Sequence, residues 1–275
     1  MENHSSSQQK LEKGITGMTA GHDGEQSKTS YKDRVFSLEG KELRYPTRFL
    51  DGSSSMGIFS VSASVADELI ADSGFKTARI APGKAALSII CVHYTDTQCG
   101  AYEEIAMAFF VQRRGRQARW AIPYLSTLWD VIRGNIASYT WCLPVSSTLS
   151  RDCGIFMWGF PKTLERIDYQ RDETRTQSSW MIDDEVVMSY SVPANGEKDA
   201  SEISPPVYSL LEGKPYVSYL TQRYTQVGHH GRDGILKLGK HAAAEPLRRL
   251  GLPKKPMIAA FNGHLEFEMS HPEPL

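Results

Sequence analysis

Apolar runs rich in β-branched and aromatic side chains recur along the chain and predict a protein built mainly of β-strands. The runs span residues 56–63, 78–80, 85–94, 101–113, 138–145, 163–170, 174–182, 185–192, 216–227, 235–238 and 257–269. Those at 85–94 and 101–113 are long and almost continuously apolar, so we expect both faces of these strands to be at least partly covered. Asp183 and Asp184 lie between two runs and predict a tight hairpin turn.

Helical signals are short and few. Residues 65–71, with Ser64 as N-cap, and residues 242–250, ended by Gly251, each predict a short helix. Residues 120–129 predict a strand that becomes irregular. Because strands and helices do not alternate, a Rossmann or TIM-barrel architecture is not expected.

Composition divides the chain into two parts. Residues 1–29 are rich in Ser, Gln, Gly, Lys and His, and have too few apolar side chains to offset the entropy of ordering. We therefore predict a disordered tail over 1–29 and a single domain over 30–275. With 40% hydrophobic and 23% charged residues, the chain has the composition of a soluble globular protein. Its formal net charge of -1 gives no reason to expect nucleic acid or an anionic membrane as partner.

The spacing of the cysteines and the composition of the N-terminus indicate where the protein is located and whether it binds a metal ion. The chain has four cysteines, Cys91, Cys99, Cys142 and Cys153. They form no CxxC pair and no metal-ligand spacing, and the two histidines of the 228–234 turn have no third ligand at usable spacing. No run approaches eighteen apolar residues, and no apolar core of a signal peptide is present. We expect a cytoplasmic protein without a metal or a membrane segment.

A lone lysine follows an aromatic residue, a glycine and a proline in the stretch from Trp158 to Lys162. Phe160 is pushed towards an extended conformation because it precedes proline, and Pro161 fixes its own φ. The side chain of Lys162 therefore projects in a defined direction from a conformationally restricted backbone. This is an unusual position for a surface lysine and indicates a functional side chain.

A second candidate group lies on the predicted strand 101–113. Tyr102 and Glu104 are two residues apart, so they face the same side of that strand, whereas Glu103 faces the other. His93 lies on the neighbouring predicted strand. For His93, a structural role in the core or at an edge stays open beside a functional one.

These two motifs together resemble those of the acetoacetate decarboxylase family, and the resemblance extends roughly over residues 55–272. In that family the lysine after an aromatic-Pro pair forms an imine with the substrate's keto group, and the glutamate of a Tyr-x-Glu motif points into the active site. The resemblance implies Lys162 as nucleophile, Glu104 as acid or base and Tyr102 as proton donor or positioning hydroxyl, without a cofactor. The expected substrate-binding residues are Trp158, Phe160 and His93.

The sequence departs from the family in two places. In the true decarboxylases a second lysine adjoins the first and lowers its pKa, whereas here the neighbours of Lys162 are Pro161 and Thr163. Burial must then supply the neutral amine that imine formation requires. An arginine that binds the substrate carboxylate is expected near residues 53–56, where the sequence carries only serines and a methionine.

The resemblance implies an α+β, mainly antiparallel β fold: a cone-shaped β-barrel around a cavity, with a few short peripheral helices, assembled as a homo-oligomer. It implies a lyase that acts on a keto-acid or polyketide-type small molecule through a Lys162 imine, by decarboxylation, aldol or dehydration chemistry, or cyclisation, with a place in secondary metabolism. The alternative is a catalytically silent binding protein on the same fold, in which a charged Lys162 pairs with Glu104. A structural or interaction module is a third possibility.

Overall fold

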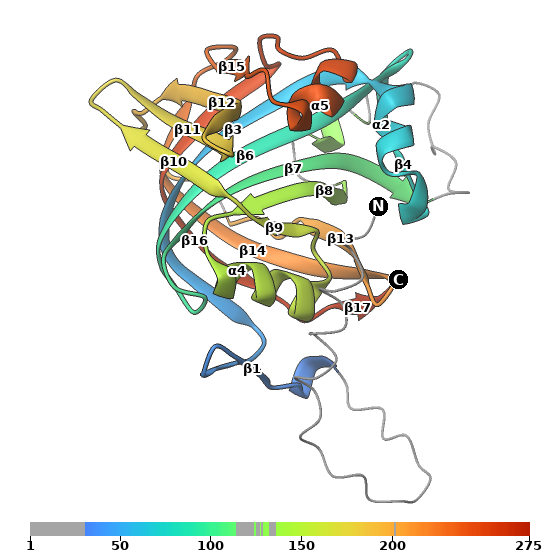
Figure 1. Cartoon of the computed structure of the whole chain (residues 1–275), viewed down its shortest axis with the longest axis vertical. Coiled ribbons are helices and arrows are strands. Elements are labelled where there is room, and N and C mark those ends of the chain that lie inside the picture. Colours follow the sequence, from blue (N-terminus) through green and yellow to red (C-terminus); the bar gives the residue numbers. More distant parts are fainter. Residues whose placement is uncertain (1–30, 114–123, 125–126, 128, 132–135, 201) are drawn as a thin grey trace, which may run out of the picture. The chain divides into compact units, whose positions relative to one another are not determined.

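The structure of the protein, a computed structural model, describes residues 31–113, 124, 127, 129–131, 136–200 and 202–275 (Figure 1). The predicted tail over 1–29 lies outside these residues. So do most of the basic segment 113–117 and most of the predicted strand over 120–129.

Two main sheets and one small hairpin contain the strands of the described residues. The larger sheet has eleven strands: β3 (Thr47–Ser62), β4 (Phe75–Thr77), β5 (Arg79–Ala81), β6 (Lys84–Thr97), β7 (Tyr102–Arg113), β8 (Ser138–Val145), β9 (Lys162–Leu164), β13 (Pro206–Leu211), β14 (Lys214–His229), β16 (Ile258–Met269) and β17 (Glu273–Pro274). The second sheet has four: β10 (Arg166–Arg171), β11 (Arg175–Ile182), β12 (Glu185–Pro193) and β15 (Ile235–Leu238). The hairpin consists of β1 (Phe36–Leu38) and β2 (Lys41–Leu43).

Strand pairings in the larger sheet return to the strand from which they start. From β7 the order runs through β6, β3, β16, β14, β13 and β8, and β8 pairs with β7 again. The pairs are antiparallel except that β8 runs parallel to both β13 and β9. Figure 1 shows the long strands curving around a common interior.

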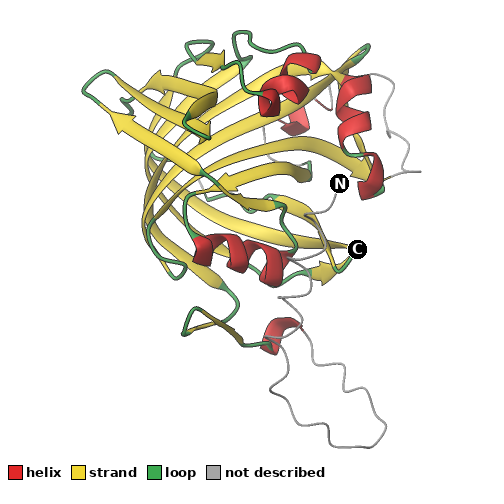
Figure 2. Cartoon of the chain, in the orientation of Figure 1, coloured by secondary structure: helices red, strands yellow, loops and turns green. Residues whose placement is uncertain are grey.

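The helices of the described residues are short and lie outside the curved strands (Figure 2). They are η1 (Tyr31–Asp33), α2 (Ala63–Leu69), η2 (Ala71–Ser73), α4 (Thr148–Cys153), η3 (Gly154–Trp158), η4 (Ala242–Ala244) and α5 (Glu245–Arg249). None of the helices in the described part of the chain has the length and apolarity needed to cross a membrane.

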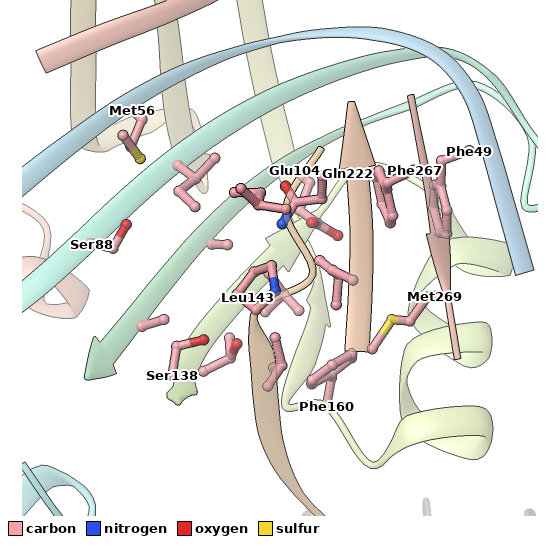
Figure 3. Close-up of a pocket in the computed structure, with 18 of the residues that line it drawn as sticks. Phe49, Met56, Ser88, Glu104, Ser138, Leu143, Phe160, Gln222, Phe267 and Met269 are labelled. Carbon is pink, nitrogen blue, oxygen red and sulfur yellow. The ribbon is translucent and has the colours of Figure 1, made fainter. Parts of the chain in front are cut away.

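Strand β7 separates the hydrophobic core from a cavity because its alternate residues face opposite sides. Ile105, Met107 and Phe109 are fully buried in the core that the larger sheet shares with residues of the second sheet, among them Trp180 and Tyr190. The even-numbered residues from Tyr102 to Phe110 line a cavity on the other face (Figure 3). The expectation that both faces of this strand are covered is therefore confirmed.

Most predicted strands are present, and the prediction of a mainly antiparallel fold with few short helices is confirmed. The turn at Asp183 and Asp184 is also confirmed: both residues have positive φ, 48° and 62°, as the tightest hairpin turns require. The predicted start of the helix over 65–71 is wrong, because α2 begins at Ala63 after Ser62, and no side chain caps it. Strand β13 and the β1–β2 hairpin were not predicted.

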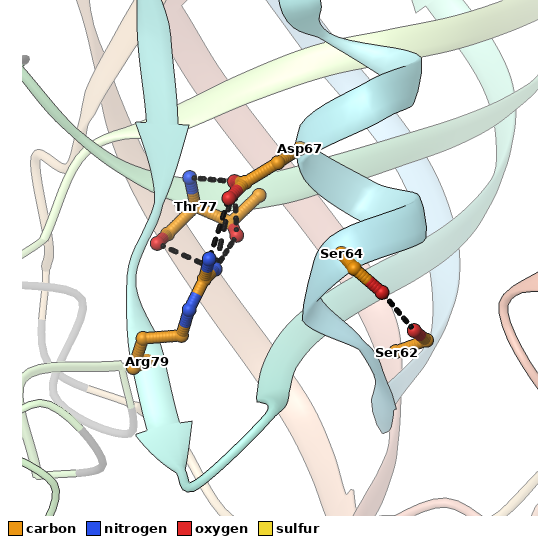
Figure 4. A network of polar contacts seen from close by, with 5 residues as sticks. All are labelled: Ser62, Ser64, Asp67, Thr77 and Arg79. Carbon is orange, nitrogen blue, oxygen red and sulfur yellow. Dashed lines mark hydrogen bonds and ion pairs between the residues drawn. The ribbon is translucent and has the colours of Figure 1, made fainter.

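A polar network ties α2 to the strands beside it (Figure 4). The Asp67 carboxylate accepts hydrogen bonds from the backbone N–H of Thr77 at 2.9 Å and from its hydroxyl at 2.8 Å. It also forms an ion pair with Arg79 at 2.5 Å. Burial raises the pKa of Asp67, but the hydrogen bonds from Arg79 and Thr77 outweigh it and hold that pKa below its usual value.

We predict that Asp67→Asn lowers the free energy of unfolding by about 1–3 kcal/mol at pH 7, because it removes a partly buried charged acceptor. Since the pKa of Asp67 is lower in the folded than in the unfolded chain, its contribution is full above about pH 4 and disappears as the pH falls through the folded value. Urea unfolding of both proteins between pH 2 and 7 measures this. Asp72→Asn, at an exposed neighbouring position, is the control. Equal destabilisation by Asp67→Asn at every pH would contradict the prediction.

Candidate active site

The backbone that leads to Lys162 is shaped by two helical segments and a proline turn. Helix α4 follows Ser147, whose hydroxyl accepts a hydrogen bond from the backbone N–H of Ser150, and continues into the wide turn η3. Gly159 ends this turn at φ 70°, where a Cβ would lie 2.3 Å from the carbonyl oxygen of Leu210 in β13. Only glycine suits both the conformation and the close approach.

Pro161 then turns the chain into β9. The backbone N–H of Lys162 donates to the carbonyl of Phe160 at 2.8 Å, which closes a tight turn around the proline. Lys162 is the first residue of β9 and pairs with Leu143 of β8, while Glu104 of β7 pairs with Val145 on the other side of β8. The lysine and the glutamate therefore approach each other across one intervening strand.

The side chain of Lys162 runs over Gly154. A Cβ added at this glycine would lie 2.4 Å from Cδ and 2.6 Å from Cε of Lys162. Such distances are far below van der Waals contact, so any larger residue at position 154 would displace the lysine. Gly154 thus fixes the path of the Lys162 side chain.

The amine of Lys162 lies in a buried polar group. Its Nζ is 2.8 Å from Oε2 of Glu104 and donates a hydrogen bond of 2.9 Å to Oγ of Ser150. It also lies 5.1 Å from the centre of the Tyr102 ring, within the range of a cation–π contact. The side chains of Lys162 and Glu104 are only 8% and 11% exposed, so this ion pair is largely removed from water.

Two tyrosines complete the group around Glu104. The hydroxyl of Tyr94 donates a long hydrogen bond of 3.5 Å to Oε1 of Glu104, and its ring lies 4.6 Å from that of Tyr102, its partner across β6 and β7. Burial, followed by the negative charge of Glu104, raises the pKa of both tyrosines well above their usual value. Both hydroxyls therefore keep their protons in the neutral range.

This polar group opens onto a cavity of about 350 Å³. The wall is mostly apolar, and Trp158 and Phe160 belong to it, as predicted for residues that would bind a substrate. Trp158 is fixed in place because its Nε1–H donates to the carbonyl of Ser270 at 2.9 Å. The sequence motifs thus meet in space: Lys162, Glu104, Tyr102, Trp158 and Phe160 all line one cavity, and their roles remain predictions.

His93 lies apart from this group. It pairs with Glu103, and its Nδ1 is 2.5 Å from Oε1 of that residue, on the face of β6 and β7 opposite to Glu104. Its ring stacks on Tyr169 of β10 at 4.4 Å between centroids. Because His93 is not among the residues that line the cavity, its placement gives no support to the predicted substrate-binding role.

Sequence reasoning missed Tyr94, Ser150 and Gly154 as parts of this site. Tyr94 could have been found from the antiparallel pairing of the two predicted strands, had the register of their turn been known. Ser150 and Gly154 gave weaker signals, since only the return of the chain at Pro161 brings Lys162 over the helix that carries them.

The described residues contain no group of three or more His, Cys, Asp or Glu side chains that could hold a metal ion, and the four cysteines are free thiols. Strand β3 contributes Phe49, Met56 and Ile58 to the cavity wall. The arginine expected from the decarboxylases has no counterpart among these three residues.

By sequence, no family model and no curated protein matches this chain. Among solved structures, the chain is similar to an acetoacetate decarboxylase from Legionella pneumophila subsp. pneumophila strain Philadelphia 1, with a TM-score of 0.64 and 15% identity over 87% of this chain and 93% of that one. It is also similar to the enduracididine biosynthesis enzyme MppR complexed with pyruvate, with a TM-score of 0.59 and 14% identity over 86% of this chain and 93% of that one.

A third similar structure is an acetoacetate decarboxylase-like enzyme from Sphingomonas wittichii RW1, with a TM-score of 0.56 and 11% identity over 87% of this chain and 97% of that one. Identities this low establish similarity of fold. The chain therefore has an acetoacetate decarboxylase-like fold.

Proposed function

We propose that this protein is a lyase-type enzyme in which Lys162 forms an imine with the carbonyl group of a small-molecule ketone or keto acid. The observation that carries the proposal is the buried contact of the Lys162 amine with Glu104 at 2.8 Å, at the wall of an apolar cavity. A lysine on the surface would have neither the acid–base partner nor the dry surroundings that imine chemistry requires.

In the proposed reaction, Glu104 accepts a proton from the Lys162 ammonium, and the neutral amine attacks the carbonyl carbon. Tyr94 or Tyr102 donates a hydrogen bond to the developing oxyanion, because both hydroxyls keep their protons. The tetrahedral adduct then loses water. Atoms and charge balance: a ketone and a lysine ammonium give a protonated imine and one water molecule.

The protonated imine withdraws electrons from the neighbouring carbon, so several reactions become accessible. Loss of carbon dioxide, removal of an α-proton, and making or breaking a carbon–carbon bond all use the same electron sink. The similar enzyme MppR is complexed with pyruvate, a keto acid, which supports a carbonyl compound as the ligand class here. Cytoplasmic location, homo-oligomeric assembly, a cone-shaped closed barrel and a place in secondary metabolism stay predictions.

A second candidate function is a catalytically silent binding protein. The same ion pair favours it, because an amine that is held by Glu104 and Ser150 can serve to neutralise a buried carboxylate without reacting. The two functions differ in whether a covalent bond to Lys162 forms.

We predict that borohydride traps a covalent adduct on Lys162 when the protein is incubated with acetone, pyruvate, acetoacetate or a β-diketone. Intact mass and peptide mapping locate the adduct, and Lys162→Arg abolishes it. Lys254→Arg is the matched control, since Lys254 is a partly buried lysine whose amine donates to the carbonyl of Ser60 and which does not line the cavity. Absence of an adduct with every compound between pH 5 and 9 would favour the binding protein.

We predict that Gly154→Ala slows adduct formation about 100-fold, because its Cβ would collide with the Lys162 side chain and move the amine. The rate of trapping and the melting temperature are measured together. Gly213→Ala is the control: it strains a residue with φ 73° in the β13–β14 turn, where a Cβ meets no atom within 4 Å. A folded Gly154→Ala protein that is trapped at the wild-type rate would show that the path of the lysine is not constrained by Gly154.

A further inference from the structure

The described wall of the cavity carries one charge of each sign. Among its described lining residues, Lys162 and Glu104 are the only charged side chains, and they pair with each other at 2.8 Å. The described wall is therefore electrically neutral. Its remaining side chains are apolar, aromatic, hydroxyl or amide groups.

A substrate carboxylate would find no cation of its own among these described residues. It would either compete with Glu104 for Lys162 or stay unpaired in an apolar space, and both alternatives carry a desolvation cost. An uncharged ketone avoids this cost. When it forms the protonated imine, the single positive charge stays at the lysine nitrogen, opposite Glu104.

The cavity is long. Along β7 its wall includes Tyr102, Glu104, Ala106, Ala108 and Phe110, all on the same face. At about 3.3 Å per residue, the strand from Tyr102 to Phe110 spans about 26 Å. Ala106 and Ala108 leave room over the middle of this strand, where larger side chains would fill the cavity.

Both ends of the cavity have apolar side chains, and one end also has hydroxyl groups (Figure 3). Phe49, Phe267 and Met269 lie at one end, with the aromatic side chains that surround Lys162. Ser88 and Ser138 lie at the other end, on the far side of Glu104. A ligand that fills the cavity would therefore extend away from the ion pair towards hydroxyl groups.

The hydroxyl side chains of Ser88 and Thr140 lie in one row across the sheet. Ser88 of β6 pairs with Ala108 of β7, and Ala108 pairs with Thr140 of β8. Ser88 and Thr140 are only 4% and 7% exposed, and both line the cavity. Each of these hydroxyls can donate a hydrogen bond to a ligand oxygen at this level of the cavity.

We propose that the substrate is an elongated, uncharged ketone, with its reacting carbonyl at Lys162 and a second oxygen at the level of Ser88 and Thr140. Ala108 lies four residues from Glu104, about 13 Å along β7, which corresponds to a chain of roughly eleven bonds. This inference rests on the proposed function and narrows its substrate class. Short keto acids are then poor substrates.

The substrate class also limits the reaction. An uncharged ketone has no carboxylate to lose, so the imine would serve aldol-type chemistry. A base removes the α-proton, the resulting enamine carbon forms a bond to a second carbonyl carbon, and that carbonyl oxygen takes up a proton. Water then hydrolyses the imine and releases Lys162.

The test uses two matched pairs of probes: acetone with pyruvate, and methyl 10-oxoundecanoate with 10-oxoundecanoate. The concentration for half-maximal borohydride trapping is measured for each. We expect the long ester to be trapped at about 100-fold lower concentration than acetone, because its chain is buried in the cavity. The free acid should need at least about 10-fold more than its ester, and pyruvate at least about 10-fold more than acetone. Pyruvate or the free acid trapped as efficiently as its uncharged partner would overturn the proposal.

Three variants locate the binding of the long chain. Ala108→Phe should abolish the advantage of the ester over acetone while acetone is still trapped, and Ala242→Phe, at an exposed position outside the cavity, should change nothing. Thr140→Val keeps the shape of the side chain and should weaken trapping of the ester about 10-fold, without affecting 2-undecanone, which lacks the second oxygen. Unchanged trapping of the ester by both cavity variants would overturn the predicted position of the chain.

A separate measurement distinguishes failure of the inference from failure of the proposed function. Lys162→Arg cannot form an imine but keeps the positive charge. Binding of the same probes to this variant is therefore measured without trapping. Tryptophan fluorescence reports the binding because Trp158 lines the cavity. If the ester binds and the acid does not, while the wild type forms no adduct with any probe, the ligand class holds and imine catalysis is wrong. Equal binding of ester and acid overturns the inference whatever the outcome of trapping.

Discussion

The buried ion pair between Lys162 and Glu104 is the interaction on which the candidate site depends. Removing two charges from water costs several kcal/mol for each ion, and their attraction offsets this only if the geometry is good and further hydrogen bonds are made. Here Ser150 accepts from the amine, and Tyr94 donates weakly to the carboxylate. The pair also needs a lysine that crosses Gly154 without steric conflict. The glycines and the proline around this lysine are consequences of that requirement.

The two faces of β7 connect the site to the stability of the fold. Ile105, Met107 and Phe109 of this strand are fully buried in the core shared with the second sheet, whereas Glu104 and its even-numbered neighbours face the cavity. The rigid core therefore fixes the position of the carboxylate, and the second partner arrives from β9 on the other side of β8. A site held by strands of a sheet is more precisely defined than one held by loops.

The apolar runs of the sequence were sufficient to predict a fold made mainly of strands, and the motifs that resemble the family were sufficient for the groups that meet in the cavity. Tyr102 and Glu104 share a face by strand geometry, and Pro161 restricts the backbone before Lys162. The sequence was not sufficient for His93, whose face depends on the register of the β6–β7 turn, and periodicity within one strand carries no information about that register. The contacts of Lys162 with Ser150 and Gly154 depend on how the chain returns after a helix, which is likewise a property of tertiary structure.

The neutrality of the ion pair is the electrostatic basis of the selectivity that we propose for the cavity. A ketone that reacts with a protonated lysine brings no charge and leaves none, since the imine nitrogen carries the positive charge that the ammonium carried before. The attraction to Glu104 thus persists through the reaction, and no new charge has to be desolvated. A keto acid would add a negative charge to a described wall whose only cation is already paired. In the proposed function, the contact that holds the buried lysine therefore also disfavours the acidic substrates that a decarboxylase requires.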